Sequence, residues 1–315
     1  MIEILRYEDR FSDEIRALFE SLAKEIDHNG DVRKETMHVA VEEGAVVGVC
    51  FLLETSSYRY ADRKRPGYLG MELEVKPMEN EVEISAMLMD TLIYEYRRIC
   101  DAEGNKRLIL RTFCYSSSVE YMNFLSWLGF RAQHFMYRMK KDLTETVPNK
   151  GNGNFEFVIT RRNGRDEKIE VETVDAETEG ATKKLEGYFE ANKRVFGVPD
   201  SENELRYRLK EQKGIQFLAR SKGKVIAAVS VWENKPDNVS TENIFCIKEY
   251  RRLGVTEKLL GGVCAYLAGR GYKEASLYVY GVNTYAVELY RKLGYVIYGG
   301  LIHMLYEDGY VPEMI

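Results

Sequence analysis

An imperfect internal repeat limits the folds open to this chain more than any other feature of its sequence. The segment His38–Glu54 matches Phe217–Glu233, and each consists of two β-rich runs that meet at a glycine, Gly44 or Gly223. Two such runs around a turn are typical of a β-hairpin. We therefore expect one hairpin in each half of the chain.

Two further matches follow in the same order along the sequence. Gly104–Leu110 resembles Gly271–Leu277, and Phe124–Phe130 resembles Leu289–Tyr295. Ordered matches of this kind indicate a duplicated fold, because a solenoid would repeat every 20–50 residues, roughly. The chain has 315 residues, about twice the length of an average domain. We therefore expect two domains.

The segment Thr144–Asn154 is polar, rich in Gly, Asn and Pro, and without apolar periodicity, which is typical of a linker. It divides the chain into domains 1–143 and 155–315. In the second domain, helices and strands are expected to alternate, which predicts an α/β fold with a mixed sheet between helices. The expected helices are Glu177–Phe196, Glu202–Gln212, Val255–Gly269 and Thr284–Leu293, and the expected strands are the hairpin Ile215–Glu233, Glu242–Ile247, Ala275–Tyr280 and Val296–Tyr306.

Composition argues against several functional classes. The formal charge of −5 gives no support for a nucleic-acid surface, which needs a surplus of Lys and Arg. The five cysteines form no CxxC pair and fit neither a disulfide framework nor a metal site. We expect no signal peptide and no membrane span, because the first residues lack a basic and an apolar region and no apolar run is long enough to cross a membrane. We expect a cytoplasmic protein without a metal, a nucleic-acid partner or a membrane partner.

The segment Ile244–Leu260 is the most informative part of the chain. It reads as a buried strand that turns through a basic loop into an amphipathic helix. Free N–H groups and the dipole at the start of such a helix attract a phosphate, Gly254 lets the backbone approach it, and Arg251 and Arg252 add positive charge. An ordinary strand-to-helix turn is the alternative interpretation.

This loop resembles the acyl-CoA pyrophosphate loop of the GNAT superfamily of N-acetyltransferases, and so we expect two GNAT-like domains with mixed, mostly antiparallel sheets flanked by helices. The family pattern is Gln or Arg, two residues, Gly, one residue, then Gly or Ala. Thr256 departs from it at the sixth position, where its branched Cβ crowds a close approach. The matching residues are Arg251, Arg252, Leu253, Gly254, Val255 and Thr256.

The resemblance also assigns roles around the loop. It implies that the backbone of the preceding strand pairs with the pantetheine arm of acetyl-CoA, or of another acyl-CoA, through Phe245, Cys246 and Ile247. Asn283 is either a helix N-cap or a hydrogen-bond partner of the same arm, and both roles are compatible. Tyr290 lies two helical turns further on, as either a core tyrosine or the acid that protonates the leaving thiolate.

An attacking amine must be neutral, so the sequence also needs a candidate base. Glu242 precedes the strand that would hold the thioester and is either that base or a solvated carboxylate. Tyr278 and Tyr280 on the following strand either line an acceptor cleft or pack in the core. A basic, aromatic segment in the first half, Tyr58–Tyr68, is either a solvated loop or a contact for an anion.

The first half resembles a degenerate copy of the second. Alignment of the repeats places Leu125 opposite Tyr290 and Ser118 opposite Asn283. The segment Val75–Glu83 replaces the pyrophosphate loop, lacks glycine and, with the residue before it, contains four acidic side chains that would repel a phosphate. As in tandem GNAT enzymes, the first half is then expected to be structural and to close one wall of the acceptor cleft.

The resemblance implies an N-acyltransferase that moves an acetyl or other acyl group from acyl-CoA to an amine of a small molecule or a peptide. The alternative is a regulatory or scaffolding module that binds CoA with weak or lost catalysis. The departure at Thr256 is the feature that favours this alternative.

Overall fold

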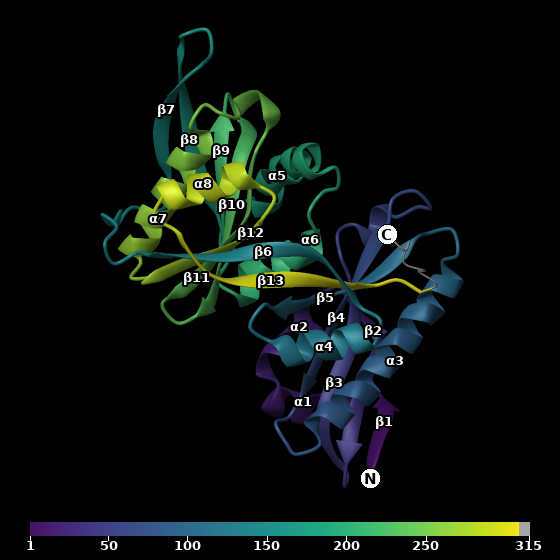
Figure 1. Cartoon of the computed structure of the whole chain (residues 1–315). Helices are drawn as coiled ribbons and strands as arrows, with labels where there is room; N and C mark the ends of the chain where they lie inside the picture. Colours follow the sequence, from purple (N-terminus) through teal and green to yellow (C-terminus); the bar gives the residue numbers. More distant parts are fainter. Residues whose placement is uncertain (309–315) are drawn as a thin grey trace. The chain divides into compact units, whose positions relative to one another are not determined.

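The computed structural model describes residues 1–308 and divides into two compact units (Figure 1). Neither unit is continuous in sequence. Unit 1 contains Met1–Cys114, Ser118–Gln133 and the residues from Ile302, and unit 2 contains Tyr115–Ser117 and His134–Leu301. The described part contains no helix that combines the length and apolar character needed to cross a membrane.

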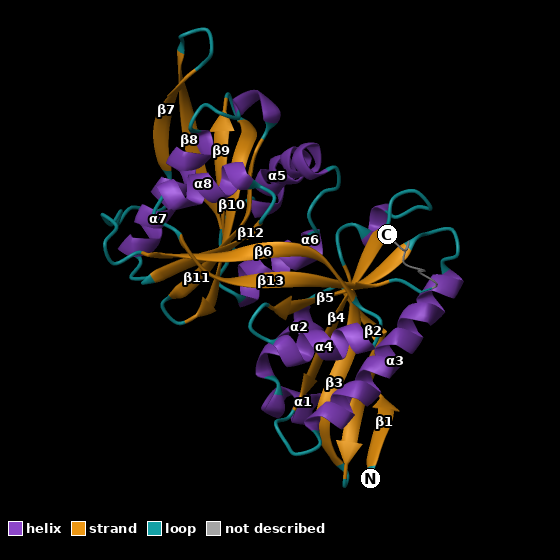
Figure 2. Ribbon diagram, in the orientation of Figure 1, coloured by secondary structure: helices purple, strands orange, loops and turns teal. Residues whose placement is uncertain are grey.

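In unit 1 a mixed sheet lies between two layers of helices (Figure 2). On β2, Val39 and Val41 face the helices α1 and α2, and Ala40 between them faces the long helix α3, as the alternation of a strand requires. The strands are β1 (Ile2–Arg6), β2 (Val32–Glu42), β3 (Ala45–Glu54), β4 (Gly67–Val75) and β5 (Leu108–Tyr115), and the helices are α1 (Ser12–Leu18), α2 (Glu20–His28), α3 (Glu81–Ala102) and α4 (Val119–Trp127).

Unit 2 is also built around mixed β-structure with helices. Its strands lie in the order β13-β6-β12-β11-β10-β9-β8-β7, and β11 and β12 run parallel. The strands are β6 (Arg131–Asp142), β7 (Phe155–Thr160), β8 (Asp166–Val174), β9 (Ile215–Ser221), β10 (Lys224–Lys235), β11 (Asn238–Cys246), β12 (Glu274–Tyr280) and β13 (Val296–Tyr306). The helices are α5 (Ala181–Phe196), α6 (Glu202–Glu211), α7 (Val255–Gly269) and α8 (Thr284–Lys292).

The last strand of each sequence half belongs, over most or part of its length, to the other unit. Strand β6 follows the first half but pairs with β12, and Met139 on it lies in the core of unit 2. The end of β13 follows the second half, but Met304 and Tyr306 lie in the core of unit 1. Domains continuous over 1–143 and 155–315 would each keep their own last strand. That boundary describes the duplicated halves and stays a prediction.

Both hairpins expected from the repeat are present. The β2–β3 turn has φ +52° at Glu43 and +83° at Gly44, and the β9–β10 turn has +49° at Lys222 and +78° at Gly223. Two successive residues with positive φ are the signature of a type I′ turn, which matches the twist of a hairpin. The sequence repeat therefore corresponds to a repeat in turn geometry.

The sequence predicted the remaining elements of the second half of the chain with one omission. Helix α7 and strand β13 have the expected bounds, and β11 begins at Asn238 rather than Glu242. The omitted element is the β7–β8 hairpin, which projects from the edge of the sheet (Figure 1). Its turn contains Asn163 and Gly164, with φ +77° at the glycine, and this Asn-Gly pair is the signal that could have revealed it.

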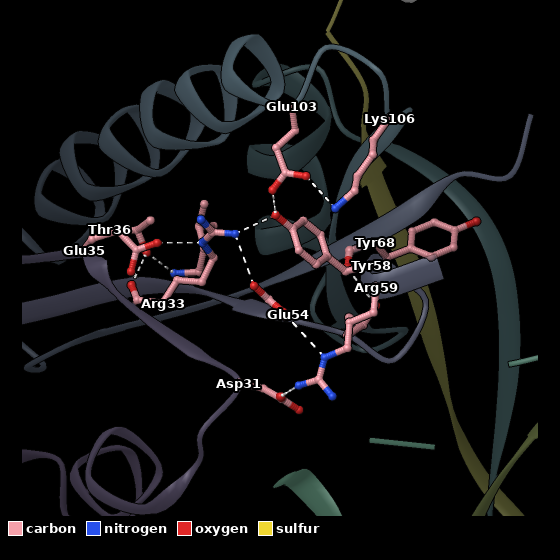
Figure 3. A network of polar contacts seen from close by, with 12 residues as sticks. Asp31, Arg33, Glu35, Thr36, Glu54, Tyr58, Arg59, Tyr68, Glu103 and Lys106 are labelled. Carbon is pink, nitrogen blue, oxygen red and sulfur yellow. Dashed lines mark hydrogen bonds and ion pairs between the residues drawn. The ribbon is translucent and has the colours of Figure 1, made fainter. Parts of the chain in front are cut away.

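Figure 3 shows that Tyr58, at the start of the basic segment of unit 1, lies in an ion-pair network. The Tyr58 hydroxyl donates to Glu103 and accepts from Arg33, and Lys106 lies 4.5 Å from the centre of its ring. Arg59 pairs with Asp31 over 2.6 Å. These cations have carboxylate or aromatic partners within unit 1, which favours a structural role for this part of the segment.

Candidate functional site

Strands β11 and β12 diverge in the middle of unit 2. Within residues 1–308 they pair over Asn238–Ser240 and Glu274–Ser276, while β11 continues to Cys246 and β12 to Tyr280. On its other edge β11 pairs with β10 and contains a bulge, since Glu242 faces Ser230 and Phe245 faces Ala228. Asn243, inside the bulge, has φ +47°. A bulge bends its strand, and here it coincides with the point where β11 leaves β12.

A partly buried carboxyl group holds this bulge. Asp200, between α5 and α6, accepts hydrogen bonds from Asn243 Nδ2 and from the Tyr188 hydroxyl, each over 2.7 Å, and from the Ser201 N–H over 3.1 Å. Burial raises the pKa of Asp200. The sequence analysis missed this group, because the residues that meet here are far apart in the chain and form no local motif.

The loop before α7 presents a row of free backbone donors. Helix α7 begins at Val255, and its N-cap Gly254 has φ +77° and no capping side chain. Within residues 1–308, none of the six N–H groups from Arg252 to Glu257 has a hydrogen-bond acceptor. Free N–H groups at a helix start suit an anion. A side chain at Gly254 would extend into open space, so the loop is accessible there.

The two loop arginines differ in their contacts. Arg251 Nε donates to the Cys246 carbonyl over 2.9 Å, so this side chain fixes the end of β11. Arg252, with φ +64°, is exposed and lies 5.6 Å from the ring centre of Tyr285 on α8. Charge for an anion is therefore more available from Arg252 than from Arg251, which occupies the first position of the family pattern.

Thr256 and the three strand residues lie behind this loop. The Thr256 side chain makes a hydrogen bond with the Cys246 thiol, whose pKa burial raises to about 12. Phe245, Cys246 and Ile247 are buried, and Phe245 packs on the rings of Tyr188 and Phe196. The Leu253 side chain packs on the same core and that of Val255 is fully enclosed by it. These side chains are structural, so any ligand contact here involves the backbone.

Asn283 and Tyr290 lie on α8 as the sequence placed them. Asn283 Oδ1 accepts from the Ala286 N–H over 3.3 Å and caps the helix, while its Nδ2 has no partner within residues 1–308. Tyr290 is 6% exposed, and burial raises the pKa of its phenol to about 12. Within the same residues its hydroxyl has no hydrogen-bond partner. The hydroxyl proton of Tyr290 is therefore not used in a hydrogen bond to another group of the described chain.

A pocket of about 410 Å³ lies where β11 and β12 still pair, and we refer to it as the β11–β12 pocket. Glu242 accepts from the Ser240 hydroxyl over 2.8 Å, and burial raises the pKa of Tyr278 to about 12. Tyr280, which the sequence grouped with Tyr278, is 41% exposed and lies against the ring of His134 instead. Alternate residues of the two strands line the pocket: Asn238, Ser240, Glu242, Glu274, Ser276 and Tyr278.

Residues 185–295 match the model of the acetyltransferase (GNAT) family. This segment is therefore a GNAT-family domain. The match contains the diverging strands, the α7 loop, Asn283 and Tyr290, so the family segment and the candidate site coincide. No curated protein gave a match to the sequence.

Solved GNAT structures resemble the whole chain. A GNAT from Sphaerobacter thermophilus is 17% identical and superposes with a TM-score of 0.63, covering 97% of this chain and 95% of its own. A tandem GNAT protein from the clavulanic acid biosynthesis pathway is 13% identical, with a TM-score of 0.60 and coverage of 99% and 100%. At these identities the likeness establishes the fold, which is that of a tandem GNAT protein.

The first half shows how the equivalent positions differ. Leu125, opposite Tyr290 in the repeat, is fully buried in the core of unit 1. The loop before α3 contains no glycine, and Glu81 and Glu83 lie in the first turn of that helix. That this half lacks a CoA site stays a prediction. Within residues 1–308 no cluster of His, Cys, Asp and Glu could hold a metal ion.

Proposed function

We propose that this GNAT protein transfers an acyl group from acetyl-CoA, or another acyl-CoA, to an amine. The observation that carries the proposal is the row of free N–H groups from Arg252 to Glu257 beside a diverging strand pair, inside the segment that matches the family. These groups would hold the pyrophosphate, with Arg252 adding charge. The open edge of β11 from Phe245 to Ile247, together with Asn283 Nδ2, would bind the pantetheine arm.

Two side chains are suited to move protons. Glu242 would take a proton from the ammonium form of the acceptor, which makes the nitrogen nucleophilic. As the nitrogen–carbon bond forms and the carbon–sulfur bond breaks, Tyr290 would give its proton to the departing sulfur. The acceptor nitrogen loses two protons in all, of which one is balanced by the proton on the thiol product and one goes to solvent.

Tyr290 suits the role of the acid because its pKa is raised to about 12, so its phenol stays protonated at neutral pH. A free thiol has a pKa of about 8.5, so the thiolate that forms is a weaker base than the phenolate. Transfer of the proton to sulfur is therefore unfavourable by itself and must be coupled to cleavage of the carbon–sulfur bond, and the phenolate that results must regain a proton after each turnover. Solvent can supply it.

The second candidate is a CoA-binding module without effective catalysis. Two observations favour it: Thr256 replaces the small residue of the family loop, and Arg251 is engaged with Cys246. Calorimetric titration with acetyl-CoA, followed by thiol release with a panel of amines, separates the two. Binding with turnover supports the transferase, binding without turnover on any amine supports the module, and no binding contradicts both.

A further inference from the structure

The β11–β12 pocket contains an arginine without a carboxylate partner. Arg138 on β6 contacts two tyrosine rings, with its guanidinium carbon 4.3 Å from the centre of Tyr115 and 4.6 Å from that of Tyr298. Within residues 1–308 it has no hydrogen bond or ion pair, and its Nε is buried without a partner. Cation–π contacts with the rings restrain the guanidinium and do not use its N–H groups as hydrogen-bond donors, so these stay available to a planar anion.

Other charged groups of this pocket already have protein partners. Glu274 accepts from Asn238 Nδ2 over 2.6 Å and pairs with Lys140 over 2.9 Å. Arg208, which lies over the ring of Trp232, is paired with Glu204. Neither Glu274 nor Arg208 therefore needs a ligand for charge balance.

Two charged side chains of the pocket interior, Arg138 and Glu242, have no ion-pair partner in the described chain, and their charges are opposite. Glu242 has the Ser240 hydroxyl as its hydrogen-bond donor and, within the part of the chain that the structure describes, no cation as partner. Lys235 is a further cation without a partner there, but it is exposed at the end of β10. The less exposed cation Arg138 and the carboxylate Glu242 together complement a small molecule that carries both charges.

We propose that the acceptor is an amine that also carries a carboxylate, with the carboxylate held by Arg138 and the ammonium group beside Glu242. The inference rests on the proposed acyl transfer and adds the chemical class of the acceptor. Tyr278 lies within electrostatic reach of both Arg138 and Glu242, so one small molecule can reach both. The volume of about 410 Å³ fits a ligand of amino-acid size.

Acceptors that differ only in the carboxylate charge test this assignment. Thiol release from acetyl-CoA is measured with a panel of amino acids and ω-amino acids and with the methyl ester of each, which keeps the amine and removes the negative charge. The wild type should favour the acids in kcat/KM by at least about tenfold, mainly through KM. In Arg138→Gln this preference should fall below about threefold, because kcat/KM should decrease more on the acids than on the esters.

A matched control and a second readout complete the test. Lys140→Gln removes a cation from the same strand, but one already paired with Glu274, so it should keep the preference for acids. Trp232 lines the pocket, and in a Trp127→Phe background its fluorescence reports binding of the same acids and esters without any turnover. The acids should quench or shift this emission, and Arg138→Gln should abolish the effect.

The outcomes separate this inference from the proposed function. Equal kcat/KM for acids and esters, equal loss on both in Arg138→Gln, or no change of Trp232 emission with any acid overturns the carboxylate assignment. Acetylation of a phosphate-bearing amine such as O-phosphoethanolamine alone also overturns it. If acetyl-CoA fails to bind, the proposed acyl transfer is wrong, while a fluorescence response to acids that depends on Arg138 still supports the anion site.

Discussion

Asn243 donates a hydrogen bond from Nδ2 to Oδ2 of Asp200 over 2.7 Å, and this contact links the bulge of β11 to the segment between α5 and α6. The bulge lies next to Glu242 and at the point where β11 and β12 diverge. The contact therefore couples the connection between α5 and α6, remote in sequence, to the opening that would admit the acyl-CoA. Asn is well suited to it, because it tolerates positive φ better than other side chains of its size.

Substitutions at Asn243 should separate the hydrogen bond from the backbone conformation. Asn243→Gly accepts φ +47° but loses the bond to Asp200, so it should cost about 1 kcal/mol in the free energy of unfolding. Asn243→Val loses the same bond and adds the strain of a branched side chain at positive φ, about 1–3 kcal/mol more. Urea unfolding measures both. Equal stability of the two variants would show that the bulge relaxes freely.

Asp200 should make stability depend on pH in one direction. Its pKa is raised by burial above the ordinary 3.8, so the native state retains a proton that the unfolded chain releases. The stabilisation from Asp200 is complete below the ordinary pKa and is lost as the pH rises through the raised value. Relative to Asp200→Asn, the wild type should therefore lose stability as the pH rises above the ordinary pKa and through the raised one. A constant or growing difference in the free energy of unfolding contradicts this.

Tyr290→Phe removes the proposed acid and keeps its ring. Turnover should fall by roughly 100-fold or more, while the acetyl-CoA affinity stays the same. Because the pKa of Tyr290 is raised to about 12, the phenol keeps its proton at lower pH, and the ratio of wild-type to variant kcat should be constant from about pH 7 to 10. Stopped assays of thiol release across this range, with calorimetry as the binding control, provide the check. Unaltered turnover removes Tyr290 from the mechanism.

Local signals explain which parts of the fold could be predicted. Helix α7 begins at Val255 as expected, because Gly254 and the apolar periodicity after it mark a helix start within a few residues. Strand β11 begins earlier than expected, at Asn238, because its first residues are polar and become a strand only through pairing with β10 and β12. Such pairing depends on distant residues.

The residues of the candidate site also divide into those that local motifs could predict and those that depend on distant pairing. The loop at Gly254 and the helix residue Tyr290 were found from short motifs, since each lies in a continuous segment. Arg138 was not found, because β6 lies in the first half of the sequence and joins β12 only in the folded chain. An alternating strand pattern contains no information on which neighbour the strand chooses. The buried contacts of Asp200 escaped notice for the same reason.

Thr256 should limit the affinity for acetyl-CoA through its branched side chain. Thr256→Ser keeps a hydroxyl that can reach Cys246 and removes the methyl group, while Thr256→Ala removes both and restores a small residue of the family pattern. If crowding by the branch is the cause, both variants should bind acetyl-CoA a few times more tightly, roughly the effect of one relieved methyl contact. Calorimetry decides the point. Weaker binding by Thr256→Ala alone would show instead that the bond to Cys246 supports the loop.

Gly254 gives the most direct test of the phosphate site, because charge and bulk can be varied separately there. Gly254→Gln and Gly254→Glu place side chains of nearly the same size at φ +77°, so both should lose about 1 kcal/mol of stability through backbone strain. Only the glutamate adds a negative charge beside the pyrophosphate, and it should bind acetyl-CoA roughly fivefold more weakly than the glutamine variant. A higher salt concentration should reduce this difference in affinity between the two variants, because salt screens the repulsion between the glutamate and the pyrophosphate. Equal affinities in calorimetric titrations at low salt would place the pyrophosphate away from this loop.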